Sequence, residues 1–327
     1  IGSTGTSDAW PVYASSITAD FTLYLYHTYA AINDAANFND TEPTSSVFTV
    51  GTWNGINKSN VDYIAYCFHS VDSFSKIDSY TGNGSSDGPF IHTGFKPAWV
   101  IIKNADTAYR WYILDNKRDT TNPNGARLFA ESGTAEATNS DIINFHSNGF
   151  KIINSDAEVN KDGDKIIYMA FAEDSEKHSN AVATFGDGNE FIQDANYPQD
   201  NFSATTYSGN SSTQKITTGV DADFVWIKNK SHSLHHYLTD SVRGEHKVIF
   251  SSSNSQEYDG TSSNDGVDSF DSDGFILQNG TNAANYNQST RDYVAWSWKA
   301  AGHEYKSASF NGSSGKIDLP LTSLFGG

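Results

Sequence analysis

The stretch "DYVAWSWKAAG", residues 292–302, decides the fold, because the chain contains its pattern three times. The other copies are "IIYMAFAED", residues 166–174, and "DYIAYCFHS", residues 62–70. Side chains alternate between the two faces of a strand, so each copy has one face of smaller residues, such as Ala295, and one bulky face, with Trp296. This pattern predicts a central strand covered on both sides, as in a β-sandwich.

Two long segments of the chain match each other with an offset of 125 residues. The matched pairs include Gly94 and Gly219, Ile102 and Ile227, Asp115 and Asp240, Arg118 and Arg243, Phe150 and Phe275, Asn160 and Asn285, Tyr168 and Tyr293, and Ala170 and Ala295. Upstream, "SYTGNGSSDGPF" pairs with "TYSGNSSTQ" after a gap of two residues. One offset kept over this length indicates a duplicated domain. We therefore expect "PAWVIIKN" and "DFVWIKN" in equivalent places, and Tyr168 and Tyr293 buried.

The N-terminal part reads as a third, incomplete copy. Tyr63 aligns with Tyr168 and Phe48 with Phe150, while the front half of the repeat, including any strand like "PAWVIIKN", is expected to be absent. Residues 303–327 form a strand-forming segment with no obvious partner. This segment is interpreted either as the cropped start of a further module or as a strand donated to the first repeat of the same or a neighbouring subunit.

The composition predicts an all-β protein made of tandem antiparallel β-sandwich repeats with a jelly-roll-like arrangement. Aromatic residues make up 13% of the chain, and turn sequences such as "NPNG" and "DSDG" separate short β-branched or aromatic runs. The expected domains are 1–76 for the incomplete repeat, 77–177 and 178–302 for the two full repeats, and 303–327 for the C-terminal segment.

Charge and cysteine content limit the function classes. The 21 Lys and Arg against 39 Asp and Glu give a net charge of −18, which argues against nucleic acid as a partner. Apolar runs stay well short of the roughly 20 residues that cross a bilayer, so membrane insertion is not expected. Cys67, the single cysteine, is expected to be a small buried residue in the position filled elsewhere by Ala172 and Ser297.

Catalytic motifs are weak, so we expect neither an enzyme nor a cofactor. Nucleophile-elbow, zinc-protease and phosphate-loop patterns do not occur in a supporting context. Four glutamates could supply a carboxylate pair for glycoside hydrolysis, but they are more typical of solvated loops. They are Glu131, Glu136, Glu173 and Glu176.

Two clusters could bind a metal ion. In "DGVDSFDSDG", four carboxylates could bind Ca²⁺, and the alternative is an acidic turn. They are Asp265, Asp268, Asp271 and Asp273, and the preceding repeat has Ser140, Ile143, His146 and Asn148 at these positions. In "SHSLHHYL", residues His232, His235 and His236 are expected at the surface near a strand end, and a metal site on a trimer axis is the alternative.

The most specific charged pair is repeated. Asp115 and Arg118 recur as Asp240 and Arg243. A ligand clamp is one interpretation. A recurring pair is more typical of a fold determinant, so we predict an ion pair or turn clasp that each sandwich needs for itself.

The repeat motifs resemble a known group of proteins. "SYTGNGSSDGPFIHTGFKPAWVIIK", "SNGFKI" and "YMAFAE" look like a repeat of tail-fibre and virion-associated proteins of marine bacteriophages, including cyanophages. "YVAWSWKA" is similar to a sister version of that repeat, and "SASFNGSSGKIDLP" resembles the start of a laminin-G or concanavalin-like sandwich.

The resemblance implies a structural and adhesive role on a virion, outside the cell, as a tail fibre or a related appendage. It implies self-association, with a trimer as one form, and contact with other virion proteins and a host surface glycan. Sandwiches in series would act as a stiff spacer whose loops bind with many weak contacts. The alternatives are a glycan-binding or glycan-degrading module of such a fibre and a bacterial surface or filament protein.

Overall fold

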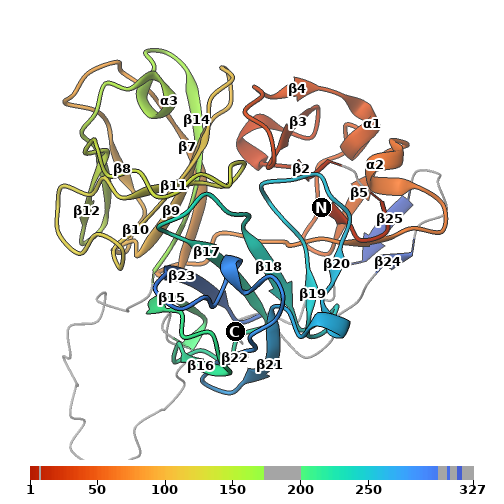
Figure 1. The fold of residues 1–327 in the computed structure, drawn as a ribbon. Coiled ribbons are helices and arrows are strands. Elements are labelled where there is room, and N and C mark those ends of the chain that lie inside the picture. The colour runs from red at the N-terminus through yellow and green to blue at the C-terminus, as the bar shows by residue number, and fades with distance from the viewer. Residues whose placement is uncertain (7–8, 173–199, 301–307, 310–314, 319–327) are drawn as a thin grey trace, which may run out of the picture.

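The computed structural model describes residues 1–6, 9–172, 200–300, 308–309 and 315–318. The strands form several antiparallel sheets and the helices are short, which confirms the all-β class. Three lobes, one for each repeat, lie around a common centre (Figure 1). In the described part of the chain, no helix is long and apolar enough to span a bilayer.

The middle repeat is built from two antiparallel sheets. Their strand orders are β11–β10–β9–β14–β7 and β12–β13–β8. The elements are β7 Ser75–Thr81, β8 Phe90–His92, β9 Trp99–Asn104, β10 Trp111–Asp115, β11 Arg127–Phe129, β12 Ile143–His146, β13 Gly149–Ile152, α3 Ala157–Asn160 and β14 Lys165–Phe171. Both sheets contribute to one apolar core, which includes Val100, Ile102 and Tyr168 from the larger sheet and Phe150 from the smaller. This is the packing of a sandwich.

The third repeat has the same plan. Its sheets have the orders β15–β23–β17–β18 and β16–β22–β21, with a short β19–β20 ladder. The elements are β15 Phe202–Ser208, β16 Gln214–Thr217, β17 Phe224–Asn229, β18 Tyr237–Asp240, β19 Lys247–Val248, β20 Tyr258–Asp259, η3 Thr261–Ser263, β21 Val267–Asp271, β22 Gly274–Leu277, η4 Ala283–Asn285 and β23 Asp292–Trp298. The strands that contain "PAWVIIKN" and "DFVWIKN" therefore occupy equivalent places beside β14 and β23, as predicted.

The first repeat is divided among three small sheets, β1–β6–β24, β2–β3–β4 and β25–β5. The elements are β1 Gly2–Ser3, β2 Pro11–Val12, η1 Ser15–Ile17, β3 Phe21–Tyr24, β4 Ile32–Asn33, α1 Ala35–Phe38, β5 Val47–Val50, α2 Asn54–Asn57, β6 Asp62–Ile64, β24 Ala308–Ser309 and β25 Gly315–Asp318. The side chain of Asp34 caps α1 by accepting a hydrogen bond from the N–H of Ala36.

The N-terminal segment contains counterparts of β9, β10 and β11, so the prediction that it has no strand like "PAWVIIKN" was wrong, whereas the counterparts of β7 and β8 are missing from it, as predicted. Ser3 on β1 pairs with Tyr63, just as Asn229 on β17 pairs with Tyr293. The β2–β3 ladder likewise corresponds to β10–β11 of the middle repeat. The sequence comparison missed these strands because β1 and β2 are only two residues long.

The C-terminal segment completes the first repeat within the same chain. β24 pairs with β6, as β7 pairs with β14, and β25 pairs with β5, as β8 pairs with β13. Ile317 lies opposite Phe48, just as Ile91 lies opposite Phe150. This pairing favours strand donation over the start of a further module. Figure 1 shows β24 and β25 in the lobe formed by the N-terminal part, with β25 beside β5.

The offset of 125 residues does not hold to the end of the repeat, which corrects the predicted alignment. Ile102 pairs with Tyr168, but its equivalent Ile227 pairs with Ala295, so the offset on the last strand is 127. Tyr293 matches Tyr63 instead of Tyr168. Each of these two hydroxyls accepts a hydrogen bond from the N–H five residues before it and donates to the carbonyl nine residues before it.

The two faces of the final strands have different partners. Tyr168 and Tyr293 are buried, as predicted, in the cores of their own repeats. The bulky residues of all three copies meet in one shared core at the centre of the molecule, where Phe171, Trp298 and Tyr66 pack together with Trp99 and Phe224. The repeats are therefore packed around a common apolar centre, and the prediction of sandwiches in series was wrong.

Candidate functional site

Three equivalent interfaces join the repeats into a closed ring. At each one, a backbone N–H that follows β3, β11 or β19 donates to the carbonyl directly after β9, β17 or β1, respectively, in the next repeat. The bonds are Ala31 to Ala105 at 2.7 Å, Glu136 to Lys230 at 2.8 Å and Glu257 to Thr4 at 3.3 Å. The first repeat thus bonds to the middle, the middle to the third and the third to the first. One geometry used three times gives the ring approximate threefold symmetry.

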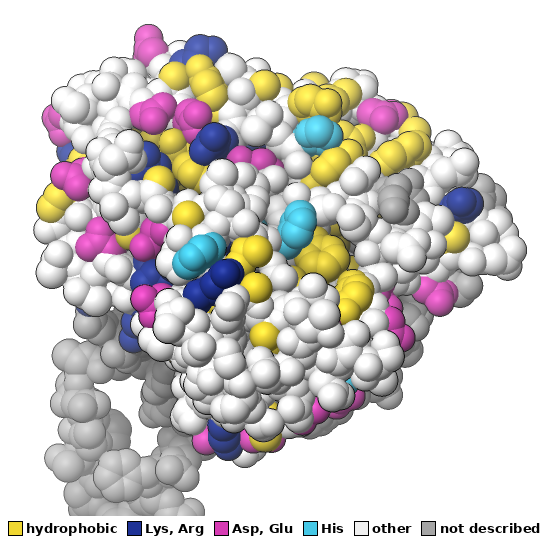
Figure 2. All heavy atoms as spheres, viewed as in Figure 1, with side chains coloured by type: hydrophobic (Ala, Val, Ile, Leu, Met, Phe, Trp, Pro, Cys, Tyr) yellow, Lys and Arg dark blue, Asp and Glu magenta, His cyan; other side chains and the backbone are white. Residues whose placement is uncertain are grey.

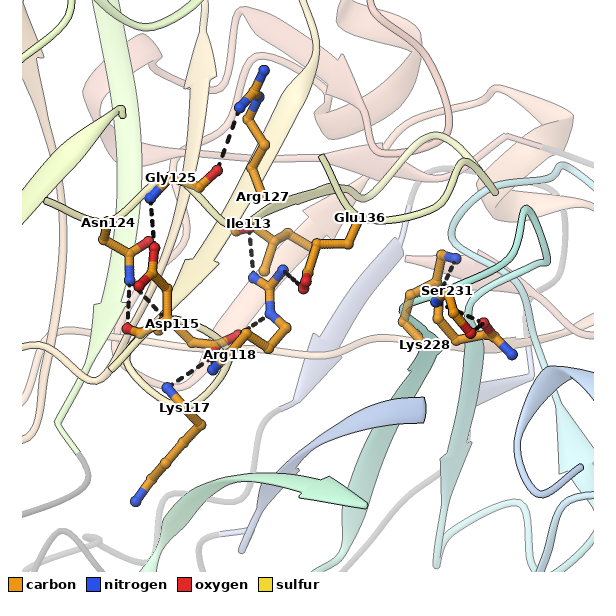
Figure 3. Close-up of polar contacts among 12 residues, drawn as sticks. Ile113, Asp115, Lys117, Arg118, Asn124, Gly125, Arg127, Glu136, Lys228 and Ser231 are labelled. Atoms are coloured by element: carbon orange, nitrogen blue, oxygen red, sulfur yellow. Dashed lines mark hydrogen bonds and ion pairs between the residues drawn. The ribbon is translucent and has the colours of Figure 1, made fainter. Parts of the chain in front are cut away.

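The predicted charged pair lies at the interface between the middle and third repeats. Arg118 Nε donates to Asp115 Oδ2 at 2.6 Å, Nη1 donates to Glu136 at 3.0 Å, and both side chains of the Asp115–Arg118 pair are fully buried. From the third repeat, Trp296 Nε1 donates to Asp115 Oδ2 at 3.0 Å, and the guanidinium lies 5.6 Å from the Trp296 ring centre. Figure 3 shows Arg118 directed between Asp115 and Glu136. We call this arrangement the clasp.

A second clasp joins the third repeat to the first. Arg243 bonds to Asp240 at 2.6 Å and to Glu257 at 3.0 Å. Tyr66 of the first repeat donates its hydroxyl hydrogen to Asp240 Oδ2 at 2.6 Å and accepts one from Arg243 at 3.3 Å. Burial raises the pKa of Tyr66 well above its ordinary value, so the phenol stays protonated and remains a donor.

The third interface has apolar residues in place of the clasp. The positions of Asp, Arg and Glu are filled in the first repeat by Ala14, Ile17 and Ala31. The position of Trp296 and Tyr66 is filled in the middle repeat by Met169, and Ala14, Ile17 and Met169 all belong to the shared core. A lone Asp or Trp N–H here would be left without its partner, so the members of the clasp are replaced together.

Two lysines are buried beside these interfaces. Lys228 Nζ donates to the carbonyls of Asn229 at 2.6 Å and His232 at 3.4 Å, and Lys103 Nζ donates to the carbonyl of Asn104 at 2.7 Å. Both residues are fully buried. Burial lowers the pKa of Lys228 to about 7, with a further reduction from Arg118, and lowers that of Lys103 to about 8.

His236 is buried, so its prediction as a surface residue was wrong. Trp226 Nε1 donates to His236 Nδ1 at 2.8 Å, which places the ring hydrogen on Nε2, 3.1 Å from the carbonyl oxygen of Ser132 in the middle repeat. Burial lowers the pKa of His236 well below its ordinary value, so the ring is neutral. His235 contacts Ser252 and His232 contacts Ser231, so the three imidazoles serve different neighbours.

The four aspartates proposed as Ca²⁺ ligands do not converge. Asp265 is buried and accepts hydrogen bonds from the hydroxyls of Tyr258 and Tyr286 and from Asn282. Of the other candidates, Asp271 and Asp273 form ion pairs with Lys215, and Asp268 lies 3.5 Å from His246. Among the described residues, no group of three or more His, Cys, Asp or Glu side chains is arranged to hold a metal ion.

The described glutamate candidates and Cys67 have different surroundings and form no common site. Glu136 belongs to the clasp, and Glu131 accepts a hydrogen bond from the N–H of Trp111, with burial raising its pKa. Glu173 and Glu176 lie outside the described residues. Cys67 is exposed, contrary to the prediction, because the chain leaves the strand after Ile64.

A concave site of about 560 Å³ lies at the outer end of the middle repeat. We call residues 116–122 the long loop. All of them except Arg118 line the site, together with the 145–147 turn and Lys96. The lining includes two lysines, one imidazole, the carboxylate of Asp119, the ring of Phe145 and several hydroxyl and amide groups. Lys117 turns its side chain away from the clasp in Figure 3. We call this the loop cavity.

The long loop occurs only in the middle repeat. In the equivalent strand pairs, Leu128 follows Ile113 by 15 residues, whereas Ile249 follows Leu238 by 11 and Leu23 follows Val12 by 11. The loop cavity was not predicted from the sequence, although four extra residues lengthen this loop, because the alignment of the repeats rests on the residues that they share.

The molecular surface offers one other unusual feature. Figure 2 shows acidic side chains spread over the face in view and hydrophobic side chains gathered over the part formed by β2–β4. Phe21, Tyr29 and Ile32 are the exposed large hydrophobic residues of this part of the chain.

Comparison with known proteins gives one family. A family model described as a domain of unknown function (DUF7483) matches residues 1–175 and 197–317. Neither the curated proteins nor the solved structures provide a match. The family match extends from the first strand of the first repeat to the C-terminal strand that completes it.

Proposed function

The chain belongs to this family, whose description assigns no function, and we propose that it is a non-enzymatic structural and adhesive module of a phage virion, on a tail fibre or a related appendage. The observation that carries the proposal is the use of the repeated polar residues. Asp115 and Arg118 and their equivalents Asp240 and Arg243 are consumed in holding the repeats together. The feature that varies between repeats is a loop on the outside, as in proteins that present binding loops on a rigid scaffold.

The placement on a virion, outside the cell, rests on the resemblance of the repeat motifs to tail-fibre proteins of marine bacteriophages. The closed ring adds a physical argument. Three repeats around one core make a compact head, which is suited to presenting loops at the end or side of a fibre. Several such heads on one particle would combine weak contacts with a host surface glycan through multivalency. Self-association, with a trimer as one form, and contact with other virion proteins belong to the same proposal.

A glycan-degrading module is less well supported. Glycoside hydrolysis needs two carboxyl groups roughly 5–9.5 Å apart beside the scissile bond. The loop cavity is lined by one carboxylate, Asp119, and that side chain accepts a hydrogen bond from the N–H of Gly125 at 3.0 Å. Incubation with a host polysaccharide is therefore expected to release no reducing ends, and their release would support the enzymatic alternative.

Antibody labelling tests the proposal directly. Antibodies raised against the purified protein should label appendages of virions in immunoelectron microscopy, and the purified protein should compete with virions for adsorption to host cells. Label on bacterial surfaces or filaments with unlabelled virions would support the bacterial alternative. If virions are labelled but the purified protein does not compete for adsorption, the structural role is supported and the adhesive role is rejected.

A further inference from the structure

We propose that residues 321–327, which follow β25 and lie outside the described part of the chain, dock on the first repeat, where residues 325–327 pair antiparallel with residues 66–68 of the same chain. Three observations carry the proposal: an open strand edge, the spacing of the chain after β25, and the residues that cover the same edge in the other two repeats. The proposed function can fail without affecting it.

The last strand of the first repeat has an edge without a partner. In the middle repeat, β14 pairs with β9 as far as Phe171, which lies opposite Trp99, and β23 pairs with β17 in the same way in the third repeat. The equivalent pairing of β6 with β1 ends at Ile64. Among the described residues, no segment forms backbone hydrogen bonds with residues 65–68, which we call the open edge. Such a row of N–H and C=O groups is a template for another strand.

The side chains of the open edge are exposed where their equivalents are buried. Phe68 is 36% exposed, whereas its equivalents Phe171 and Trp298 are 2% and 5% exposed. Cys67 is exposed as well, while Ser297 at the equivalent position is fully buried. The first repeat therefore lacks, in its described part, the strand that covers these positions in the other repeats.

β2 borders the same strand position from the other side. In the middle repeat, Ile113 of β10 pairs with Ile101 of β9, and both Ile113 and Leu114 are fully buried. Their equivalents in β2 and just after it, Val12 and Tyr13, are only partly buried. One additional strand between β2 and the open edge would cover both sides, as β9 does between β10 and β14.

The chain after β25 reaches this position in register. β25 is the equivalent of β8 and β16, which are followed by the central strands β9 and β17. In all three repeats, an aromatic residue follows the end of this strand by seven residues: Trp99 after His92, Phe224 after Thr217 and Phe325 after Asp318. Because β25 already belongs to the first repeat, the segment needs no second copy of the chain to reach the open edge.

The residue types of the segment match the equivalent positions. The third residue after the strand is buried in the other two repeats, as Phe95 and Val220, and it is Leu321 here. The fourth is exposed in both of those repeats and is Thr322 here. Phe325 brings an aromatic ring to the position from which the other two repeats place one in the shared core. Apolar residues thus stand where burial requires them.

The segment fits beside β6 without overlapping β1. Residues 325–327 take the positions of residues 99–101, and Ile1 holds the next position, that of Ile102. The amino group of Ile1 donates to the carbonyl of Pro11 at 3.0 Å, which matches the pairing of Ile102 with Tyr112. The segment and β1 would therefore follow each other along one strand position.

The ladder of the middle repeat shows which residues of the segment would lie closest to the open edge. The N–H of Ala105 donates to the carbonyl of Lys165, so these two residues form a hydrogen-bonded pair and every second pair along the ladder does the same. Val100 and Ala170 are consequently a non-hydrogen-bonded pair, with Cα atoms about 4.5 Å apart, a separation that permits a disulfide. The equivalent pair in the first repeat is Gly326 and Cys67.

An engineered disulfide tests this register. Gly326→Cys should form a disulfide with Cys67, the single cysteine of the chain, under mild oxidation at low protein concentration. The matched control is Gly327→Cys, because its side chain would point to the opposite face of the strand. Cross-linking in Gly326→Cys should be at least about tenfold faster than in the control. Non-reducing electrophoresis and the mass of the thiol-blocked protein measure the product.

Variants in the Gly326→Cys background locate the anchor. Adding Phe325→Ala should slow cross-linking about tenfold or more, because the ring that holds the segment in the shared core is lost. Phe325→Trp, which introduces the residue of the middle repeat, should retain the rate. Thr322→Ala should also retain it, because the equivalent positions are exposed in the other two repeats.

Three results would overturn the assignment: no disulfide in Gly326→Cys, equal cross-linking of Gly326→Cys and Gly327→Cys, or an unchanged rate with Phe325→Ala. Disulfide-linked dimers in place of an intrachain disulfide would assign the open edge to a second copy of the chain and would also overturn it. Virion labelling and adsorption competition, which test the proposed function, leave all of these results unaffected.

Discussion

Trp296 and Trp298 lie on the same bulky face of β23 and differ mainly in one hydrogen bond. The Nε1 of Trp296 donates to Asp115 Oδ2 at 3.0 Å, whereas the Nε1 of Trp298 is buried with no hydrogen-bond partner among the described residues. Trp296→Phe should therefore destabilise the protein by about 1.5–3 kcal/mol more than Trp298→Phe, because only the first loses a hydrogen bond to a charged acceptor. Urea unfolding of both variants gives the comparison.

The two substitutions are matched controls for each other. Each removes a similar volume from the same shared core, so the cavity contributions nearly cancel. Equal losses in the two variants would mean that the ring of Trp296 matters only for packing, and would remove the clasp as a link between repeats.

Lys228 should make stability depend on pH. Burial lowers its pKa to about 7, while the unfolded chain keeps the ordinary value of 10.5. Between these values the unfolded state binds more protons, so the unfolding free energy should rise with pH, by up to about 1.4 kcal/mol per pH unit. Lys228→Met lacks this contribution, so the unfolding free energy of the wild type should rise relative to that of the variant by about 2 kcal/mol between pH 7 and 9.

Urea unfolding at several pH values measures the effect. Lys103, with its pKa lowered to about 8, adds a similar slope to both proteins, so only the difference between them reports on Lys228. Lys230→Met, two residues along the chain and only partly buried, is the control and should run parallel to the wild type. Parallel curves for the wild type and Lys228→Met would contradict the lowered pKa of Lys228.

The burial of single residues could be predicted where side chains alternate along a strand. Their equivalence between repeats could not, because it depends on the strand register. The burial of Tyr168 and Tyr293 followed from the period-two pattern and was confirmed. Their equivalence was wrong, because a shift of two residues keeps every side chain on its face and leaves the pattern unchanged. The role of Trp296 and Tyr66 as partners of Asp115 and Asp240 was out of reach, since those contacts cross between repeats.

At the scale of elements, the C-terminal strands complete the sheets of the first repeat. β24 and β25 provide the partners of β6 and β5 that β7 and β8 provide in the middle repeat. A chain ending at residue 307 would leave the edges of β6 and β5 without these partners. We expect its melting temperature to fall by at least about 5 °C, as for the loss of a few kcal/mol, and its tendency to associate to rise.

Addition in trans distinguishes strand loss from a general effect of truncation. A synthetic peptide covering residues 306–320 should restore the melting temperature in a concentration-dependent way, because it binds the folded form. A chain ending at residue 320 keeps β24 and β25 and should melt well above the chain ending at 307. An unchanged melting temperature on truncation at 307 would show that the two strands do not support the first repeat.

The elements of the second and third repeats were largely visible in the sequence because their strands are long and their turns carry Gly, Asn and Asp. The first repeat was not, for a topological reason. Its opening strands come from the far end of the chain, and β1 and β2 are too short to carry a pattern. Strand donation was left open as one of two interpretations, and the pairing of β24 with β6 and of β25 with β5 favours it.

At the scale of the whole molecule, the same alternating strand gives two different levels of structure. The smaller faces close each sandwich, and the bulky faces close the ring. The sequence predicted that both faces of the strand are covered. It could not identify the covering sheet, because burial gives the same apolar pattern whether that sheet belongs to the same repeat or to a neighbouring one. The order of the repeats around the centre follows from the clasps, whose partners lie more than 170 residues apart.

The shared core makes a prediction that separates a ring from beads on a string. If Phe171, Trp298 and Tyr66 stabilise one another across the repeats, no repeat can unfold without exposing the bulky faces of the other two. Calorimetry should then show one transition with a calorimetric enthalpy close to the van't Hoff enthalpy. Trp296→Phe should move that transition as a whole. Independent sandwiches would instead give separable transitions, and the substitution would shift only those of the two repeats that meet at Trp296, leaving the first repeat at its wild-type temperature.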